Sequence, residues 1–381
     1  MDVNQNTKLD TMFGLSDKQK TIFSENVKQI TSKDEQRVLE NIEPQLVKLQ
    51  EVLDEKPSAK MEELILNAKH LLEILQTEDF PISESSRKWI VFGLNYLIAD
   101  FDLIPDSIPK IGYLDDALIV AWVKNIVDYD ITRYKFFMKA KDVSENGSIL
   151  KEMIQGDGQI EIILIPGLLS NKLYTDHFKK WVQLVKKTKL GEGNPGISVF
   201  NWKTNYTPEF QTTILMVDHE LNLKPSYDSE KFEIEWEQLK MDYANLSKAF
   251  YRDLKKIKTQ HPDKKIIVIA LNAATFVVDS FQEKAQVANI DDYYIFGGCS
   301  TSKTLYNDIS SQVKNVYNFY NPDDSALRFI YENYEENNLP IGCLVSFDHN
   351  KFRIKNFNLK DRIKRHNEYQ ELFVELVDST I

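Results

Sequence analysis

The spacing of apolar residues along the chain changes near residue 159. Before that point apolar side chains recur every three or four residues, most clearly over 60–75, which predicts amphipathic helices. After it, short β-branched runs alternate with amphipathic segments, a pattern typical of a mainly parallel sheet. We therefore expect an α + α/β protein, with an all-helical domain over residues 1–145 and a doubly wound α/β domain over 155–381.

Short apolar runs in the second half predict its strands, and the segments between them predict its helices. The expected strands are 160–165, 197–201, 266–269, 293–296 and 316–320. The expected helices are 175–187, 229–256, 273–286, 305–313 and 326–332. A segment rich in Gly, Asn, Asp and Ser, 142–158, marks the domain boundary. Ligands of such sheets bind beyond the carboxyl ends of the strands, so we look for function there.

Composition narrows the function classes. The 58 acidic and 47 basic residues give a net charge of −11, which disfavours non-specific binding to nucleic acid. Cys299 and Cys343 are the only cysteines in 381 residues, which favours a reducing compartment over a disulfide framework. The polar start of the chain and the lack of a run of about 18 apolar residues predict a cytoplasmic protein. No nucleotide-binding glycine motif is present, and we expect no cofactor.

The stretch 264–279 carries the clearest sign of a site. A β-branched run leads into Ala270-Leu271-Asn272-Ala273-Ala274, and a helical segment follows. This order resembles the nucleophile elbow G-x-S-x-G, with alanines at the glycine positions and Asn272 at the serine position. Alanine is small enough for the close approach of strand and helix, and Asn tolerates a positive φ. We expect the elbow geometry to persist although its hydroxyl nucleophile is absent.

A second motif lies in the helical half. It reads D-L-I-P-D-S-I-P over 102–109 and continues as G-Y-L-D-D over 112–116. This resembles the YkvA-like small helical domain found across bacteria, whose hallmark is D-x-I-P-D-x-I-P followed by G-x-x-D-D. The matching residues are Asp102, Pro105, Asp106, Pro109, Gly112, Asp115 and Asp116. The resemblance implies an all-helical module and transfers no chemistry.

Two alternatives stay open in this half. Asp100, together with the motif aspartates, places five carboxylates close in sequence, which suits Mg²⁺ or Ca²⁺. Turn formation and helix capping, by Asp115 or Asp116, are the favoured explanation because the Ca²⁺-loop spacing is missing, so we expect no metal. The apolar segments 89–92 and 118–122 suit peripheral membrane contact or, alternatively, packing against each other.

Features at the ends of the other expected strands extend the elbow resemblance. Pro166-Gly167-Leu168 follows the first strand, Asp324 follows a later one, and His366 comes last. Together they resemble the hydrolase-like family that includes the eukaryotic transmembrane-and-coiled-coil proteins, with its G-F-L-S loop, G-H-S-L-G elbow and late G-H-x-x-Y. The resemblance implies an α/β-hydrolase-type fold with Asp324 as acid, His366 as base and the Leu168 amide as an oxyanion donor. Asn272 then stands at the nucleophile position.

Plainer interpretations accompany these roles. Asp324 also suits the N-cap of a helix, and His366 lies in a charged stretch that suits a solvated surface.

Two functions follow from the pattern. The first is a non-catalytic module, binding a small molecule or protein at the strand edge. The alternative is an ester or lipid hydrolase that uses Cys299, or Asn272 after deamidation, although Cys299 also suits a buried apolar position.

Overall fold

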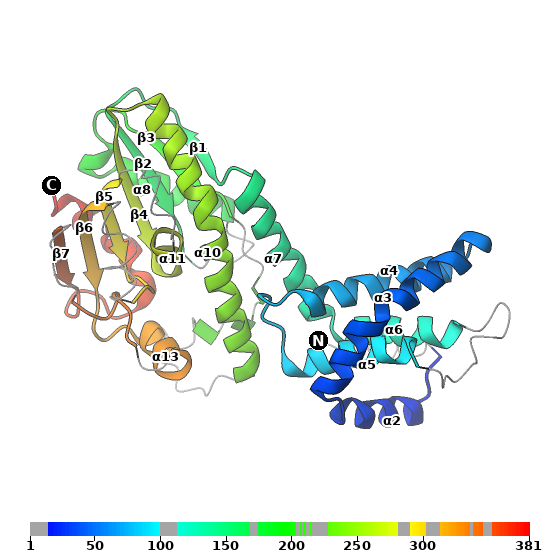
Figure 1. Cartoon of the computed structure of the whole chain (residues 1–381). Helices are drawn as coiled ribbons and strands as arrows, with labels where there is room; N and C mark the ends of the chain where they lie inside the picture. The colour runs from blue at the N-terminus through cyan, green and yellow to red at the C-terminus, as the bar shows by residue number, and fades with distance from the viewer. Residues whose placement is uncertain are drawn as a thin grey trace. The chain divides into compact units, whose positions relative to one another are not determined.

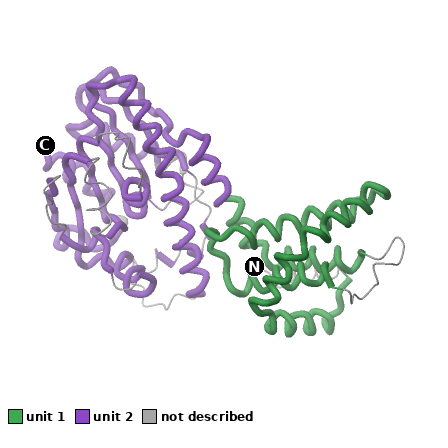
Figure 2. Tube along the Cα trace, viewed as in Figure 1, with its two compact units in different colours: residues 1–136 green, residues 137–381 purple. Residues whose placement is uncertain are grey.

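Amphipathic helices make up the described part of the first of two units, residues 1–136 and 137–381 (Figure 2). The computed structural model describes residues 14–99, 113–167, 174–202, 206–207, 209–210, 213–214, 228–280, 290–301, 313–335, 338–345 and 353–381. The helices of the first unit are α2 (Asp17–Lys28), α3 (Ser32–Glu55), α4 (Ala59–Gln76), α5 (Glu84–Leu97) and α6 (Leu114–Ile126). α7 (Asp128–Asn146) begins in the first unit and ends in the second.

Local signals start these helices where the sequence places them. Ser16 and Gln19 form a reciprocal capping box at α2, with Gln19 Oε1 accepting from the Ser16 amide at 2.9 Å. Ser83 Oγ accepts from the Ser86 amide at 3.0 Å and caps α5. The apolar stripe of α4 is buried against α6 and α5, which confirms the predicted helix over 60–75. α5 buries a continuous run, Ile90–Leu94, so it lies deeper in the helical interior than a helix with a single buried stripe.

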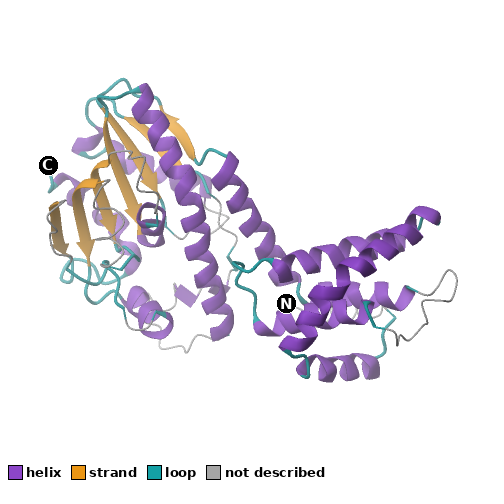
Figure 3. Cartoon of the chain, viewed as in Figure 1, coloured by secondary structure: helices purple, strands orange, loops and turns teal. Residues whose placement is uncertain are grey.

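The second unit contains a sheet that has seven strands within the described residues (Figure 3). Its order is β1-β3-β2-β4-β5-β6-β7, with β1 antiparallel to β3 and all other pairs parallel. The strands are β1 (Leu150–Ile154), β2 (Ile160–Ile165), β3 (Gly196–Phe200), β4 (Lys265–Leu271), β5 (Ile290–Phe296), β6 (Val313–Tyr320) and β7 (Arg353–Asn358). A helical first part followed by a mainly parallel α/β part confirms the predicted fold class.

Helices cover both faces of this sheet (Figure 1). α10 (Ser229–Gln260), α11 (Thr275–Asp279) and α13 (Ser325–Tyr334) share one apolar core with Val268 and Tyr293. α8 (Tyr174–Lys186) and α14 (Tyr369–Asp378) share the other with Ile267 and Tyr294. Successive strand residues therefore point to opposite cores, which is why the inner strands read as continuous apolar runs.

Two strands were not predicted, because both lie at sheet edges. β1 reads LKEMI and β7 reads RIKNFN, and each carries exposed charged residues that break up the apolar pattern. Charged side chains on edge strands prevent pairing with other chains, so the edge position itself hides the strand signal. The helix predicted over 305–313 is wrong at Val313, which begins β6, and its other residues lie outside the described ones. The helix predicted over 273–286 starts as a 3₁₀ turn, and α11 ends at Asp279.

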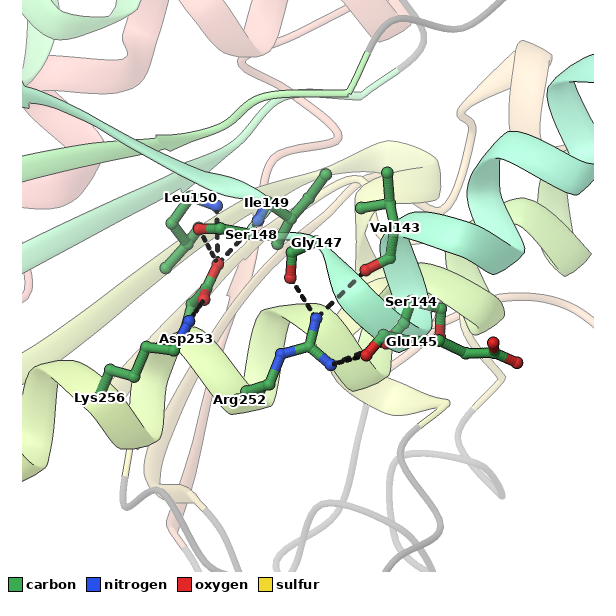
Figure 4. A network of polar contacts seen from close by, with 10 residues as sticks. All are labelled: Val143, Ser144, Glu145, Gly147, Ser148, Ile149, Leu150, Arg252, Asp253 and Lys256. Atoms are coloured by element: carbon green, nitrogen blue, oxygen red, sulfur yellow. Dashed lines mark hydrogen bonds and ion pairs between the residues drawn. The ribbon is translucent and has the colours of Figure 1, made fainter.

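The junction between α7 and β1 is held by two neighbouring residues of α10 (Figure 4). The Arg252 guanidinium donates to backbone carbonyls at the end of α7, namely those of Ser144 (2.8 Å), Glu145 (3.2 Å), Val143 (3.2 Å) and Gly147. Asp253 Oδ2 accepts from the Ile149 amide (2.7 Å), the Leu150 amide (3.1 Å) and the Ser148 hydroxyl (2.8 Å). The last carbonyls of a helix have no partners within it, and a cation suits that end of the dipole. Arg252 and Asp253 thereby fix where α7 stops and the sheet begins.

Candidate functional site

The turn that follows β4 has a left-handed residue at its centre. Asn272 has φ 54°, and Asn194 is the only other described residue, glycine aside, with a positive φ. The chain then forms a 3₁₀ turn over Asn272–Ala274 and continues into α11. Ala270, Ala273 and Ala274 are completely buried, so larger side chains have no room there. Strand, left-handed residue and helix follow one another as in a nucleophile elbow.

The end of β2 touches this turn. A Cβ on Gly167 would lie 2.7 Å from the Leu271 carbonyl oxygen and 3.1 Å from both Cβ and Nδ2 of Asn272. Backbone and side chain meet so closely that a side chain at position 167 would displace one of them. Gly167 therefore permits the contact between the loop after β2 and the turn after β4. Leu168, the expected oxyanion donor, lies outside the described residues.

A histidine and a carboxylate meet after β6 and β7. Nδ1 of His366 lies 2.6 Å from Oδ2 of Asp324, and the carboxylate is completely buried while the ring side chain is 13% exposed. Asp324 is also the N-cap of α13, where its Oδ1 accepts from the Leu327 amide at 3.0 Å. One oxygen thus caps the helix and the other accepts from Nδ1–H. The hydrogen bond to α13 fixes the Asp324 carboxylate, and the carboxylate orients the imidazole of His366. Nε2 is then the ring nitrogen that points away from Asp324.

One short segment links this pair to the turn after β4. In the bridging segment, Gly297–Ser300, the Cys299 amide donates to the Asn272 carbonyl oxygen at 3.2 Å. At its other end Gly297 has φ 54°, and a Cβ there would lie 3.2 Å from Cε1 of His366 and 2.7 Å from the ring of Tyr369. Asn272 and His366 therefore both lie next to one segment, and Asp324 contacts His366, at the carboxyl ends of the strands where such sheets bind ligands.

Tyr369 packs beside His366. Their rings meet edge to face, with centroids 5.9 Å apart, and Tyr369 is buried. Burial, with a further contribution from the negative charge of Asp324, raises the pKa of Tyr369 well above its usual value. The phenol therefore stays neutral and supports the imidazole through packing.

Cys299 is poorly suited to nucleophilic attack. Its side chain is 2% exposed, and burial raises its pKa well above the usual thiol value, with smaller contributions from Asp324, Cys343 and Glu335. The thiolate is the reactive form, so a raised pKa suppresses reactivity at neutral pH. Its carbonyl oxygen accepts from the Tyr331 hydroxyl, which further fixes the bridging segment. Both cysteines are buried and unbridged.

Part of the helical motif lies outside the described residues: Asp100, Asp102, Pro105, Asp106, Pro109 and Gly112. Asp115 and Asp116 are described and buried in the first turn of α6, and Asp115 Oδ2 accepts from the Tyr96 hydroxyl at 2.9 Å. The expectation that one of them caps α6 is wrong, because Tyr113 is the N-cap and makes no side-chain cap. Their place in the first turn still suits the helix dipole. Within the described residues no group of three potential metal ligands gathers.

The apolar segments of the helical unit pack inward. Ile90, Val91, Ile119 and Val120 are almost completely buried, and the rings of Trp89 and Trp122 meet edge to face at 5.2 Å. These residues therefore form helix–helix contacts within the unit. Among the described helices none is long and apolar enough to cross a bilayer.

Sequence reasoning placed Cys299 after a strand but missed the contacts of the bridging segment and its partner Thr275. Thr275 Oγ1 accepts from the amides of Cys299 and Ser300, both at 3.1 Å. The contacts of the bridging segment run through backbone groups, which leave no side-chain motif to find. The paired glycines Gly297-Gly298 after a strand were the one available signal, because closely packed backbone requires them.

Two comparisons bear on the chain. Residues 86–122 match the family described as "Protein of unknown function (DUF1232)", and this match covers most of α5 and most of α6. It overlaps the residues on which the YkvA-like resemblance rests and supports a small helical amino-terminal domain. A comparison with proteins of curated function finds no match.

Proposed function

We propose that the second unit is a degenerate α/β-hydrolase-type module, which binds a small molecule or a protein at its strand edge without turning it over. One observation carries the proposal: Asn272 holds the left-handed conformation of an elbow residue while offering no hydroxyl. The first unit is, in this proposal, a YkvA-like helical module tethered to it. The cytoplasm is the proposed compartment, supported by the two unbridged cysteines.

The chain order supports this proposal. Asn272 follows β4, Asp324 follows β6 and His366 follows β7, in the order nucleophile, acid, histidine that α/β-hydrolases use. The contact between Nδ1 of His366 and Asp324 is the one that orients a general base in such triads. Loss of the nucleophile in a serine hydrolase lowers turnover by about 10⁶-fold. A retained histidine–aspartate pair therefore supplies little acyl transfer without a serine.

A working hydrolase is the second candidate, and it needs a different nucleophile. The burial of Cys299 and its raised pKa count against the thiol. Deamidation of Asn272 would place an aspartate at the elbow, a nucleophile that some covalent hydrolases use. Ala273 follows Asn272 and is completely buried, which disfavours that conversion.

Esterase and labelling assays test the proposal. The wild-type protein should neither hydrolyse p-nitrophenyl esters nor react with a fluorophosphonate probe. His366→Ala is the informative variant, and His261→Ala, at the exposed end of α10, is its control. Turnover that His366→Ala abolishes and His261→Ala retains would overturn the non-catalytic assignment.

Two further measurements identify the nucleophile if turnover is found. Loss of activity in Cys299→Ser would assign it to the thiol. A mass gain of deamidation in the peptide containing Asn272, quantitative in fresh protein, would assign it to the carboxylate formed there.

Binding is tested separately, by native mass spectrometry of gently purified protein. The proposal expects a co-purified mass that disappears on exchange into denaturant.

A further inference from the structure

Thr275 occupies a central place between the two halves of the site. It is the first residue of α11 and is completely buried. Its hydroxyl donates to the Asn272 carbonyl oxygen at 2.9 Å and accepts from the amides of Cys299 and Ser300, each at 3.1 Å. A hydroxyl has one donor hydrogen and two acceptor lone pairs. All of that capacity is used here to join the turn after β4 to the bridging segment.

The methyl group of Thr275 is engaged as well. Its Cγ2 lies 3.0 Å from where a Cβ on Gly298 would stand, so it packs on the backbone of the bridging segment. Threonine has restricted χ1 freedom because its Cβ is branched. Methyl contact and three hydrogen bonds therefore hold the hydroxyl in one orientation.

The same segment contacts the histidine. Gly297 packs against Cε1 of His366 and the ring of Tyr369, and its amide donates to the Phe319 carbonyl oxygen at 3.1 Å. Any displacement of Cys299 and Ser300 therefore reaches Gly297 through two peptide units and then reaches the imidazole. Further anchors on this segment are the Tyr331 hydroxyl, which donates to the Cys299 carbonyl, and the amides of Gly342 and Ile341, which donate to the carbonyls of Gly298 and Ser300 at 2.9 Å each.

We propose that Thr275 is a positioning residue that sets the orientation of His366 relative to Asn272 by fixing the bridging segment. The inference rests on the proposed function only in treating Asn272, Asp324 and His366 as one site. Thr275 touches no ligand in this scheme. It acts on the imidazole through the backbone that the imidazole packs against.

The test follows His366 by NMR in the ¹⁵N-labelled full chain. The chain has six histidines, so the signals of His366 are identified by their absence in His366→Ala. Thr275→Val keeps the shape of the side chain and removes all three hydrogen bonds, whereas Thr275→Ser keeps the hydroxyl. The matched control is Thr188→Val, another buried threonine in the same unit, whose hydroxyl donates to the Val185 carbonyl at 2.7 Å.

The expected result separates positioning from stability. In Thr275→Val the ring moves away from Asp324, so its titration midpoint falls by about half a pH unit, because a nearby opposite charge favours the protonated imidazole. The Nδ1–H signal of His366 should also weaken, because its hydrogen bond to Asp324 becomes longer. Thr275→Ser and Thr188→Val should leave both signals as in the wild type, even where stability declines.

An unchanged His366 midpoint and Nδ1–H signal in folded Thr275→Val would overturn the proposal. If that variant does not fold, Tyr331→Phe takes its place, since it removes the other side-chain hydrogen bond to the same segment. Unchanged His366 signals in folded Tyr331→Phe would then overturn it. Ester hydrolysis by the wild-type protein would overturn the proposed non-catalytic function, but it would not affect the NMR result on Thr275. The failure of one proposal is therefore distinguishable from the failure of the other.

Discussion

Buried tyrosines should make the second unit unfold abruptly in alkali. Burial is the main cause that raises the pKa of each of five phenols above the usual value: Tyr243, Tyr251, Tyr293, Tyr331 and Tyr369. Each of these side chains is at most 2% exposed. In the unfolded chain the same phenols ionise near pH 10. The folded state therefore holds more protons than the unfolded state above that pH.

The sign and size of the effect follow from linkage. A raised folded-state pKa contributes stability that is fully present below about pH 10 and is lost as pH rises beyond it. Each phenol that ionises only on unfolding costs about 1.4 kcal/mol per pH unit. Together the five phenols lower the free energy of unfolding by about 7 kcal/mol at pH 11, which is comparable to the whole stability of a typical domain.

Urea unfolding at about pH 7, 10 and 11 measures this loss, and tyrosinate absorbance records ionisation. We expect the five buried phenols to ionise in one step that coincides with the loss of near-ultraviolet circular dichroism. Tyr243→Phe should reduce the alkaline slope by about 1.4 kcal/mol per pH unit. Ionisation of all tyrosines near pH 10 while the protein stays folded would refute the reasoning.

Substitutions at three other positions of the second unit give further predictions. Arg252→Met should lower the free energy of unfolding by about 2 kcal/mol, measured by urea denaturation, and Arg252→Lys should lose less, because charge is kept at the end of α7. Gly297→Ala should cost about 2–3 kcal/mol in the same assay, from its positive φ and its clash with Tyr369. Asn272→Ser should fold, and it should gain slow fluorophosphonate labelling that requires His366; labelling that persists in the double variant with His366→Ala would contradict the base role.

The inner strands of the sheet were predicted well, because a strand that is buried on both faces reads as a continuous apolar run. β2 was predicted with the observed bounds, and β4 and β5 were found a few residues short at their ends. The edge strands were missed for the opposite reason: Lys151 and Glu152 in β1, like Arg353 and Lys355 in β7, read as loop. Apolar periodicity reports burial, and it reports a strand only where the strand is buried.

The site was predictable only where it depends on side chains with a recognisable order. Asn272, Asp324 and His366 were found because their sequence follows that of a nucleophile, an acid and a base, and their roles stay a prediction. The N-cap and acid interpretations of Asp324 proved compatible, since its two oxygens have separate partners. The contacts of the bridging segment were not predictable beyond the signal of its paired glycines, because its own amides and carbonyls make those contacts and every residue has such groups.

The hydrogen bonds by which Arg252 and Asp253 hold the junction between α7 and β1 have a consequence for folding during synthesis. The Ile149 amide donates to the carboxylate of Asp253, which comes 104 positions later in the chain. While the ribosome extends the polypeptide, the end of α7 and the amides of Ile149 and Leu150 therefore lack their partners Arg252 and Asp253 until α10 has emerged. Chains usually fold one domain at a time, amino-terminal domain first. The helical unit can thus complete its fold early, whereas in the sheet-containing unit β1 can pair with β3 before α10 is made, but its junction with α7 is held only after α10 has emerged.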